Sequence, residues 1–596
     1  MVNKKMINLS INNIKIEVPE GTMLTEAAHS IGINIPTLCS VEGKHTLGAC
    51  RVCIVEVEGF KSFVTACTTP VQQGMKVYTS TQRLRKARKT VVELLLSEHD
   101  GDCQLCERIE DCELHRLVDD LGVMSVPYAG IKSAHYIDDT TPALVRNNAK
   151  CIKCRRCVTV CNEIQAVGAL FPQKRGFDTV IGPAFDLNLA DVACVQCGQC
   201  AAICPVAAIT EKSHIDMVWK ALDDPNKYVV VQTAPAIRAA LGECFDMEPG
   251  TLVTNKMVTA LKQLGFDKVF DTNFAADLTI MEEGHELLDR LKKSIVDKKN
   301  VPLPMFTSCS PGWIKFAEYF YPEFLQNIST CKSPQQMFGA IAKSYFANKM
   351  NINVQNMVVV SIMPCTAKKF EAQRPEINAS GITDVDYVLT TRELAKMLKQ
   401  ANITSYFPKL PDSIMDNPLG EGTGAADIFA NTGGVMEAAI RTVYEVVTGK
   451  ELPTKNLHLK TIMGLKGLKK AELTINGTLP EYQFLEGITL KVAVVHGLKN
   501  VVELFKLIKS GEVFHFVEVM TCPGGCIGGG GQPRFTTDEI REKRIGAIYK
   551  EDENKQLRKS HKNPEISRLY EEFLGAPLSK ISHHLLHTNY EQRKKF

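Results

Sequence analysis

The residues best suited to chemistry lie between Glu518 and Pro533, where Cys522 and Cys526 stand among six glycines. Glycine reaches positive φ freely and lets the backbone approach a ligand that a Cβ would keep away. The apolar run from Val513 to Val519 comes just before and is predicted to be a buried strand. Ligands of open α/β sheets bind at the carboxyl ends of strands. The pattern indicates a bulky metal cofactor held against backbone; a flexible surface loop with incidental cysteines is the alternative.

Two further runs share the spacing Cys-x2-Cys-x2-Cys-x3-Cys and form an internal repeat at 43 residues. This spacing is typical of two [4Fe–4S] clusters, in which the fourth cysteine of each run binds the other cluster. It disfavours structural zinc. The expected ligands are Cys151, Cys154, Cys157 and Cys204 for one cluster, and Cys194, Cys197, Cys200 and Cys161 for the other.

Two more metal-binding groups precede this repeat. They are Cys39, Cys50, Cys53 and Cys67, and then His99, Cys103, Cys106 and Cys112. The first group offers four thiolates, the usual ligand set of a [2Fe–2S] cluster, although its spacing differs from that of plant-type ferredoxins. The second offers one imidazole and three thiolates, which suit tetrahedral zinc as well as iron–sulfur. Zinc is the alternative at both groups, and the neighbouring clusters favour a third accessory [4Fe–4S] cluster at the second.

Composition limits the other possibilities. A chain of 596 residues is predicted to form about three to five domains. Its net charge of +3 indicates no nucleic-acid partner, and no apolar run approaches the length of a membrane span. The N-terminal residues lack a signal-peptide pattern, so a cytoplasmic protein is expected. In that setting the 21 cysteines, of which 15 are clustered between residues 39 and 204, indicate metal rather than disulfides.

Strand and helix patterns must position these groups. Residues 5 to 18 alternate around Asn12 and Asn13 as a β-hairpin does, and a short helix from Met23 to Ile31 suggests a β-grasp unit. A helix rich in Arg, Lys and Leu follows from Arg83 to Ser97. From about residue 213 short buried strands alternate with amphipathic helices, which predicts an α/β domain with largely parallel sheets.

Three of those strands run directly into Cys309, Cys365 and Cys522. If the strands are parallel, their carboxyl ends bring the three loops to one crevice. The predicted strands are Lys227 to Val231, Lys268 to Asp271, Pro304 to Phe306, Met357 to Ile362, Val385 to Leu389, and Lys491 to Val495.

The three cysteine loops closely resemble the signature loops of [FeFe]-hydrogenases. Their sequences are Thr307-Ser-Cys-Ser-Pro-Gly-Trp313, Met363-Pro-Cys-Thr-Ala-Lys-Lys-Phe-Glu371 and Met520-Thr-Cys-Pro-Gly-Gly-Cys526. The cysteine-rich front third is similar to the accessory domains of large, monomeric, clostridial-type members. The likeness covers nearly the whole chain.

The resemblance implies an H-cluster, a [4Fe–4S] cubane joined through a cysteine sulfur to a di-iron unit with CO, cyanide and azadithiolate. The cubane ligands would be Cys365, Cys522 and Cys526, with Cys526 as the bridge. Lys368 would hydrogen-bond a cyanide, and Met363 and Met520 would pack the pocket.

The resemblance also implies a proton relay from the cofactor to the surface. Its expected members, in order, are Cys309, Glu371, Ser329 and Glu286, then Glu283 and Arg290. Solvated charge on a helix surface is the alternative for Glu283 and Glu286.

Ser310 departs from the family pattern, which has a cubane-binding cysteine at this position. Serine is a hard ligand where iron–sulfur clusters prefer soft thiolate. Three interpretations stay open: Ser310 binds as alkoxide and lowers the cubane potential, Cys309 swings over to bind, or the cubane is incomplete.

The expected function is that of a cytoplasmic, monomeric [FeFe]-hydrogenase that exchanges electrons with ferredoxin and depends on maturases. A hydrogen-sensing or strongly biased homologue, an electron-transfer subunit of a larger complex, and a cluster-assembly protein are the alternatives. Five regions are expected: a [2Fe–2S] domain (1–80), a His/Cys3 domain (81–135), a two-cluster ferredoxin-like domain (136–212), an α/β H-cluster domain (213–545) and a small-subunit-like segment (546–596).

Overall fold

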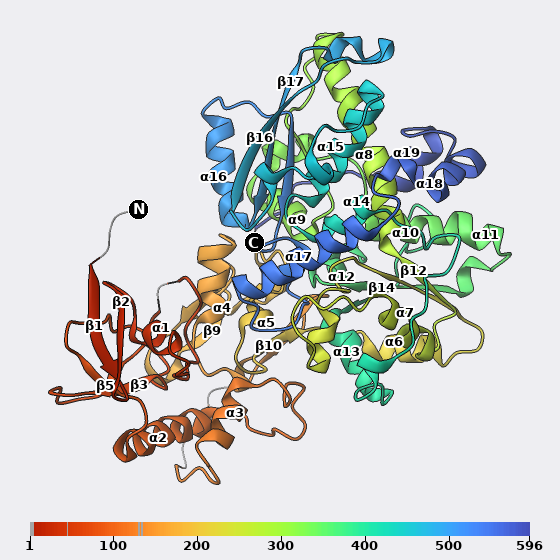
Figure 1. Cartoon of the computed structure of the whole chain (residues 1–596). Helices are drawn as coiled ribbons and strands as arrows, with labels where there is room; N and C mark the ends of the chain where they lie inside the picture. The colour runs from red at the N-terminus through yellow and green to blue at the C-terminus, as the bar shows by residue number, and fades with distance from the viewer. Residues whose placement is uncertain (1–4, 45, 129–131, 133–134, 596) are drawn as a thin grey trace.

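The computed structural model describes the whole chain except residues 1–4, 45, 129–131, 133–134 and 596. A small N-terminal lobe, red to orange in Figure 1, stands beside a larger body formed by the rest of the chain. The lobe contains a five-stranded sheet in the order β2-β1-β5-β3-β4. Its elements are β1 (Met6–Ile11), β2 (Ile14–Pro19), α1 (Leu24–His29), β3 (Ile54–Val57), β4 (Val64–Thr65) and β5 (Lys76–Tyr78).

The predicted hairpin and helix of this lobe are confirmed. Asn12 and Asn13 connect β1 to β2 with φ values of 49° and 66°, the left-handed pair that a two-residue hairpin turn requires. Helix α2 (Gln82–Glu98) follows, and its Arg88 reaches back into the sheet domain. The Arg88 guanidinium donates to the carbonyls of Val52 (2.9 Å) and Ile54 (2.7 Å), beside Cys53.

The next region packs short elements around the cysteine repeat. A three-stranded sheet in the order β10-β7-β6 lies under two short helices that carry cysteines of the two runs. The elements are α3 (Glu113–Asp120), β6 (Ile137–Asp138), β7 (Leu144–Asn147), α4 (Arg156–Thr159), β8 (Phe171–Gln173), β9 (Val180–Gly182), α5 (Gln199–Ile203) and β10 (Ile209–Glu211).

The larger body is an α/β domain with two four-stranded sheets. The first has the order β12-β11-β14-β15 and is parallel throughout. Strand β14 (Met357–Met363) is buried at every residue, as expected where helices cover both faces. The other strands of this sheet are β11 (Tyr228–Thr233), β12 (Lys268–Asp271) and β15 (Tyr387–Thr390).

The second sheet has the order β13-β18-β17-β16. Strands β13 (Met305–Phe306), β18 (Phe516–Met520) and β17 (Thr489–His496) are parallel, whereas β16 (Leu468–Thr474) is antiparallel. The largely parallel architecture is confirmed. Strand β16 was not among the predicted strands because only alternate residues of this edge strand face the protein.

Helices cover both sheets, and the 24-residue α8 (Thr272–Ile295) crosses the interior with most of its residues buried (Figure 1). The other long helices are α6 (Ile215–Leu222), α7 (Thr254–Gln263), α9 (Pro311–Phe320), α10 (Pro334–Ile341), α13 (Thr391–Gln400), α15 (Gly434–Thr448) and α16 (Leu498–Lys509). Shorter ones are α11 (Ala347–Lys349), α12 (Ala367–Glu371) and α14 (Gly424–Asp427).

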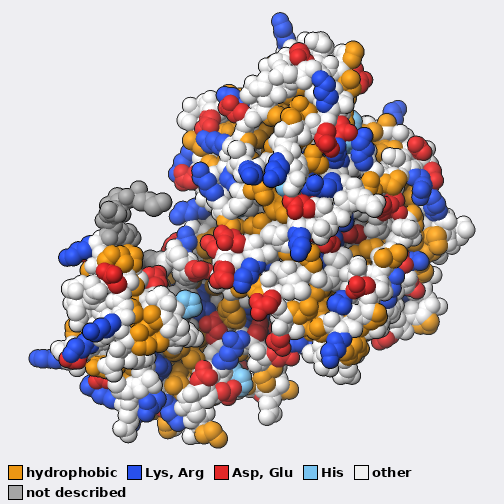
Figure 2. Space-filling view, viewed as in Figure 1, with side chains coloured by type: hydrophobic (Ala, Val, Ile, Leu, Met, Phe, Trp, Pro, Cys, Tyr) orange, Lys and Arg blue, Asp and Glu red, His pale blue; other side chains and the backbone are white. Residues whose placement is uncertain are grey.

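The C-terminal segment wraps the body with α17 (Asp538–Asn554), α18 (Pro564–Leu569) and α19 (Lys580–Leu586). Helix α17 runs through residue 545 without a break, so the expected boundary between residues 545 and 546 would divide this helix. The C-terminal segment is better taken to start at Asp538, the first residue of α17. Charges of both signs are mixed over the face in Figure 2, in keeping with the small net charge. Within the described ranges, every helix is too short or too polar for a membrane crossing.

Candidate active site

Three loops meet at a pocket with a cavity volume of about 80 Å³. Each loop follows the carboxyl end of a strand: β13, β14 or β18. The predicted convergence therefore occurs, but across two sheets rather than along one, because β14 belongs to the first sheet and the others to the second. The lining includes Cys309, Ser310, Met363, Cys365, Lys368, Met520, Cys522 and Cys526.

The donor set of the pocket suits an iron–sulfur cluster. Burial raises the pKa of Cys526 to about 12 and also raises that of Cys365 and Cys522, and the nearby Cys365 further raises the pKa of Cys522 and Cys526. Thiols held so close together in a dry site become thiolates only when a cation shares their charge. Three soft donors at one pocket thus fit the cubane that the loops predict.

Ser310 also lines this pocket. It stands directly before α9, and its Oγ lies 2.7 Å from Thr521 Oγ1. The backbone N–H of Thr521 also donates to Ser310 Oγ at 3.2 Å. The hydroxyl is therefore held in place between its own loop and the loop that follows β18.

The glycine-rich stretch serves mainly to bring backbones together. A Cβ at Gly530 would lie 2.2 Å from the carbonyl oxygen of Cys197, and one at Gly529 would lie 2.1 Å from that of Pro364. Gly525 has φ +93° and sits against the backbone of Thr432. Gly525 and Gly529 also line the pocket, so part of the expected approach to a ligand is retained.

Lys368 and Glu371 form a separate polar group at the pocket. The Lys368 ammonium donates to the carbonyl of Cys309 (3.1 Å) and to Glu371 Oε2 (2.8 Å). Glu371 also accepts from Ser333 Oγ at 2.9 Å and from Gln335 Nε2 at 3.2 Å. The structure thus gives Glu371 a place beside Lys368, away from the step between Cys309 and Ser329 that was predicted for it.

A row of protonatable groups begins at Cys309 and runs along α8. Burial raises the pKa of the Cys309 thiol, and the nearby Glu283 carboxyl raises it further. Ser329 Oγ donates to Glu286 Oε2 at 2.8 Å, and Arg290 Nη2 donates to Glu286 Oε1 at 2.6 Å. All of these side chains except that of Cys309 are fully or almost fully buried, which excludes the solvated helix surface.

Glu283 lies between Cys309 and Glu286. Burial and then the Glu286 charge raise the pKa of Glu283 to about 8, although the Ser308 N–H and the Ser329 hydroxyl oppose the rise. Among the described residues, neither of its oxygens has a partner at normal hydrogen-bond geometry. The geometric order is therefore Cys309, Glu283, Ser329, Glu286 and Arg290, which corrects the predicted outer position of Glu283.

The cysteines of the repeat form two crossed groups. Cys204 raises the pKa of Cys151, Cys154 and Cys157, whereas Cys194 raises the pKa of Cys161. The fourth cysteine of each run thus lies with the other run, as the two-cluster arrangement requires. Burial is the largest cause of the raised pKa of each of these four thiols.

The two front groups are also assembled. Cys53 Sγ lies 3.2 Å from Cys67 Sγ, and Cys39 hydrogen-bonds with both Cys50 and Cys67. In the second group His99, Cys103 and Cys112 line one pocket. Burial is the largest cause of the raised pKa of Cys103 and Cys112, and the nearby Cys106 raises both values further. His99 Nδ1 is buried without a partner among the described residues, as expected of a metal ligand.

The cysteine groups adjoin one another from the N-terminal lobe to the catalytic pocket. Cys39, Cys50, Cys112 and Cys154 belong to one buried cluster. At the other end, Cys522 raises the pKa of Cys197, after the effect of burial.

Two side chains that the sequence analysis did not single out form hydrogen bonds between the cysteine-repeat region and the loops of the catalytic pocket. Thr366 Oγ1 donates to the carbonyl of Gln196 at 2.8 Å, and Gln199 Nε2 donates to that of Gly528 at 2.9 Å. Both residues lie inside the cysteine motifs, at positions between the cysteines, and the spacing of the cysteines gives no indication of the contacts that these intervening side chains make.

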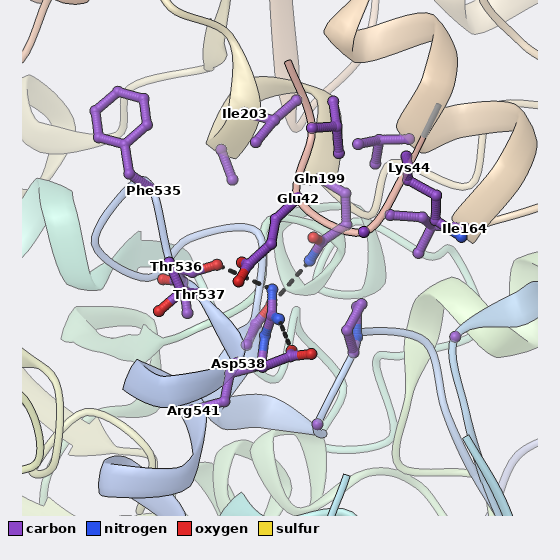
Figure 3. Close-up of a pocket in the computed structure, with 18 of the residues that line it drawn as sticks. Glu42, Lys44, Ile164, Gln199, Ile203, Phe535, Thr536, Thr537, Asp538 and Arg541 are labelled. Carbon is purple, nitrogen blue, oxygen red and sulfur yellow. Dashed lines mark hydrogen bonds and ion pairs between the residues drawn. The ribbon is translucent and has the colours of Figure 1, made fainter. Parts of the chain in front are cut away.

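A large surface crevice lies apart from the pocket (Figure 3). It separates the loop of Glu42 and Lys44 from Arg541 of α17, where the N-terminal lobe meets the body. Gln199 lies on its wall, and Arg541 is held by Asp538 and by the carbonyl of Thr536. None of the described residues that line this crevice is a cysteine. The smaller pocket where the three cysteine loops meet is therefore the better candidate for the active site.

Comparison with known families agrees with this arrangement. Residues 227–530 match the C-terminal domain of the iron only hydrogenase large subunit, and residues 538–593 match the iron hydrogenase small subunit. The front third matches a 2Fe-2S iron-sulfur cluster binding domain (4–82), the NADH-ubiquinone oxidoreductase-G iron-sulfur binding region (88–127) and a 4Fe-4S dicluster domain (150–208).

Two full-length relatives are similar. The NADP-reducing hydrogenase subunit HndD of Solidesulfovibrio fructosivorans is 50% identical over 596 residues, which is 99% of this chain and 100% of the relative. Iron hydrogenase 1 of Clostridium pasteurianum is 41% identical over 599 residues, 98% of this chain and 100% of the relative. A solved structure of [FeFe]-hydrogenase HydA1 from Chlamydomonas reinhardtii shares 43% identity and a TM-score of 0.58, covering 64% of this chain and 100% of that one. The chain belongs to the [FeFe]-hydrogenase family.

Proposed function

We propose that this hydrogenase interconverts H2 with two protons and two electrons at the pocket where its three cysteine loops meet. The observation that carries the proposal is the union of three buried thiols with a chain of protonatable groups that leads away from them. When bound, an H-cluster supplies the iron site at which H2 forms or splits. Cys365, Cys522 and Cys526 would hold it, with Cys526 bridging to the di-iron unit.

The other pocket residues orient and shield this site. Lys368 offers ammonium donors to a cyanide ligand, and Met363 and Met520 exclude water with apolar side chains. A dry site suits H2, which is small and apolar, whereas protons need titratable groups or hydroxyls. Cys309 keeps its proton because burial and Glu283 disfavour its thiolate.

Protons would pass from Cys309 through Glu283, Ser329 and Glu286 to the side of the protein where Arg290 lies. Glu283, with a pKa of about 8, gives and takes a proton near neutral pH. Ser329 passes a proton by donating from one side of its hydroxyl while accepting on the other. Arg290 stays protonated and fixes the orientation of Glu286.

We propose that Ser310 is the fourth cubane ligand and binds through its side-chain oxygen. The Thr521 N–H donates to that oxygen, and the Thr521 hydroxyl, 2.7 Å away, is placed to donate a second hydrogen bond to its negative form. Oxygen ligation predicts a lower cubane potential than thiolate ligation gives.

Spectroscopy of protein that carries the cubane without the di-iron unit tests this ligation. Ser310→Cys should raise the midpoint potential, and Ser310→Ala should change the electron paramagnetic resonance signal. If Ser310→Ala leaves the signal unchanged while Cys309→Ala abolishes the cluster, Cys309 is the ligand. Low iron content in both the parent and Ser310→Ala would support an incomplete cubane.

Electrons would travel along one [2Fe–2S] and three [4Fe–4S] clusters in the front third. Ferredoxin is the proposed external carrier. A second candidate is a partner subunit that reduces NADP+, favoured by 50% identity to an NADP-reducing hydrogenase subunit over 99% of the chain. Rapid H2-driven reduction of ferredoxin by the isolated chain supports the first. Failure there, with NADP+ reduced only after a flavoprotein partner is added, supports the second.

H2/D2O exchange by the matured protein tests the reaction without an external electron carrier. Brisk exchange, with CO and cyanide infrared bands, supports the hydrogenase. Bands without exchange favour a sensory or strongly biased homologue. Absence of the bands after full maturation favours a cluster-assembly role.

A further inference from the structure

A second hydrogen-bonded chain leaves Glu286 and enters the C-terminal segment. Glu286 Oε2 accepts from the backbone N–H of Thr330 at 3.1 Å, and the hydroxyl oxygen of Thr330 lies 3.4 Å from the same carboxylate oxygen. Thr330 Oγ1 lies 2.8 Å from His587 Nδ1, and His587 Nε2 lies 3.1 Å from Glu282 Oε2. The chain therefore links two glutamates of α8 through a hydroxyl and an imidazole.

Backbone pairing holds the imidazole in this place. His587 pairs with Cys331 in an antiparallel bridge, with Thr588 N–H donating to the carbonyl of Thr330 at 2.7 Å. Lys332 N–H donates to the carbonyl of Leu586 at 2.7 Å. Donor atoms of Glu286, Cys331 and His587 lie within 4.8 Å of one another, and all three residues are buried.

Glu282 sets the tautomer of His587. Besides the imidazole, this carboxylate accepts from Tyr570 (2.6 Å), from the Ser582 hydroxyl and from the Leu578 N–H (2.9 Å). Burial raises the pKa of Glu282, but the hydrogen bonds from His587, Ser582 and Tyr570 outweigh it and hold the pKa below its usual value. An ionised Glu282 binds the protonated Nε2, which leaves Nδ1 to face Thr330 as an acceptor.

We propose that His587 accepts protons from Glu286 through Thr330 and so forms a second arm of the relay. Glu286 gives its proton to Thr330 Oγ1 while the Thr330 hydroxyl gives its own to His587 Nδ1. The reverse step recharges Glu286, and no electron moves in either. The imidazolium that forms is stabilised by Glu282. This inference rests on the proposed hydrogenase function.

The other neighbours of Glu286 cannot take this role. Arg290 is permanently protonated and has no site for another proton. Ser329 leads inward to Glu283, and burial raises the pKa of the Cys331 thiol, 3.9 Å from Glu286, well above its usual value. Among the described hydrogen-bond partners of Glu286, Thr330 alone leads to an imidazole, a side chain that can hold a proton on either ring nitrogen.

The imidazole of His587 also lies next to an exposed one. The His583 ring of α19 stacks on that of His587, with centroids 4.2 Å apart. Burial and His587 lower the pKa of His583. The titratable and charged groups that face His587 are Glu282, Glu286, Arg290, Cys331, Tyr570 and His583.

The test compares variants by H2/D2O exchange across pH and by the solvent isotope effect. His587→Gln and Thr330→Val should each lower exchange about tenfold, a smaller loss than the roughly 100-fold or more expected for a group that carries all of the proton transfer. They should also flatten the pH profile and raise the isotope effect. Thr330→Ser should recover at least half of the rate lost in Thr330→Val. His584→Gln, at an exposed histidine of the same helix, is the matched control and should match the parent.

A second measurement follows His587 by NMR in cofactor-free protein with labelled histidine. Glu286→Gln and Glu282→Gln should each shift its titration midpoint, which shows the coupling without turnover. If the parent is active and the His587→Gln and Thr330→Val variants keep its pH profile and isotope effect, the proposed second arm of the relay is wrong. An inactive parent overturns the proposed function instead, and the NMR coupling then still decides whether His587 and Glu286 share protons.

Discussion

Replacement of Glu283 by glutamine should stabilise the protein at high pH while it blocks proton transfer. The pKa of Glu283 rises from its usual 4.5 to about 8 because the side chain is buried and faces Glu286. At about 1.4 kcal/mol per pH unit, this rise corresponds to about 5 kcal/mol. Glutamine keeps the size of the side chain and has no charge to bury.

The sign follows from the protons that each state binds. Between pH 4.5 and about 8 the folded protein holds a proton on Glu283 that the unfolded chain has released, so this residue makes stability fall as pH rises through that window. The loss of folding stability caused by the buried Glu283 charge is fully present above about pH 8 and absent below pH 4.5. Glu283→Gln should therefore unfold like the parent at pH 4 and be more stable by up to about 5 kcal/mol at pH 9.

Denaturant unfolding of the catalytic domain in cofactor-free protein measures the stability, and H2/D2O exchange of matured protein measures the relay. Exchange should fall at least about 100-fold because glutamine carries no exchangeable acid proton. Glu282→Gln is the matched control on the same helix: its carboxylate is already satisfied by four donors, so glutamine there should destabilise the fold. Equal stability of parent and Glu283→Gln at pH 9, or parental exchange rates, would refute the reasoning.

Two further substitutions test the frame around the site. Gly530→Ala places a Cβ 2.2 Å from the Cys197 carbonyl and should force the ferredoxin-like region away, lowering carrier-dependent H2 production at least about tenfold in a steady-state assay. Gly546→Ala, with open space around its Cβ, is the control and should not lower that rate. Arg238→Met leaves the buried Asp427 without its guanidinium partner at 2.7 Å and should cost about 3–5 kcal/mol in the free energy of unfolding; unchanged stability would contradict this.

The sequence was most informative where chemistry constrains spacing. The four-cysteine runs predicted crossed groups before any contact was known, because a cube accepts thiolates only at set separations. The strands before Cys309, Cys365 and Cys522 were equally clear, since a buried strand between helices needs a continuous apolar run. Their division between two sheets was not predictable, because each apolar run fits either sheet equally well.

The order of the relay shows where sequence reasoning stops. Residues 283, 286 and 290 recur at helical spacing, so α8 must present them on one side. The same charged pattern is typical of a solvated helix face, and only burial among the loops of Cys309 and Ser329 turns it into a proton path. Glu282 is adjacent in sequence yet faces the C-terminal segment, where four donors keep it ionised. Neighbouring glutamates thus acquire opposite pKa shifts from their tertiary partners, and the intervals between residues carry no information about those partners.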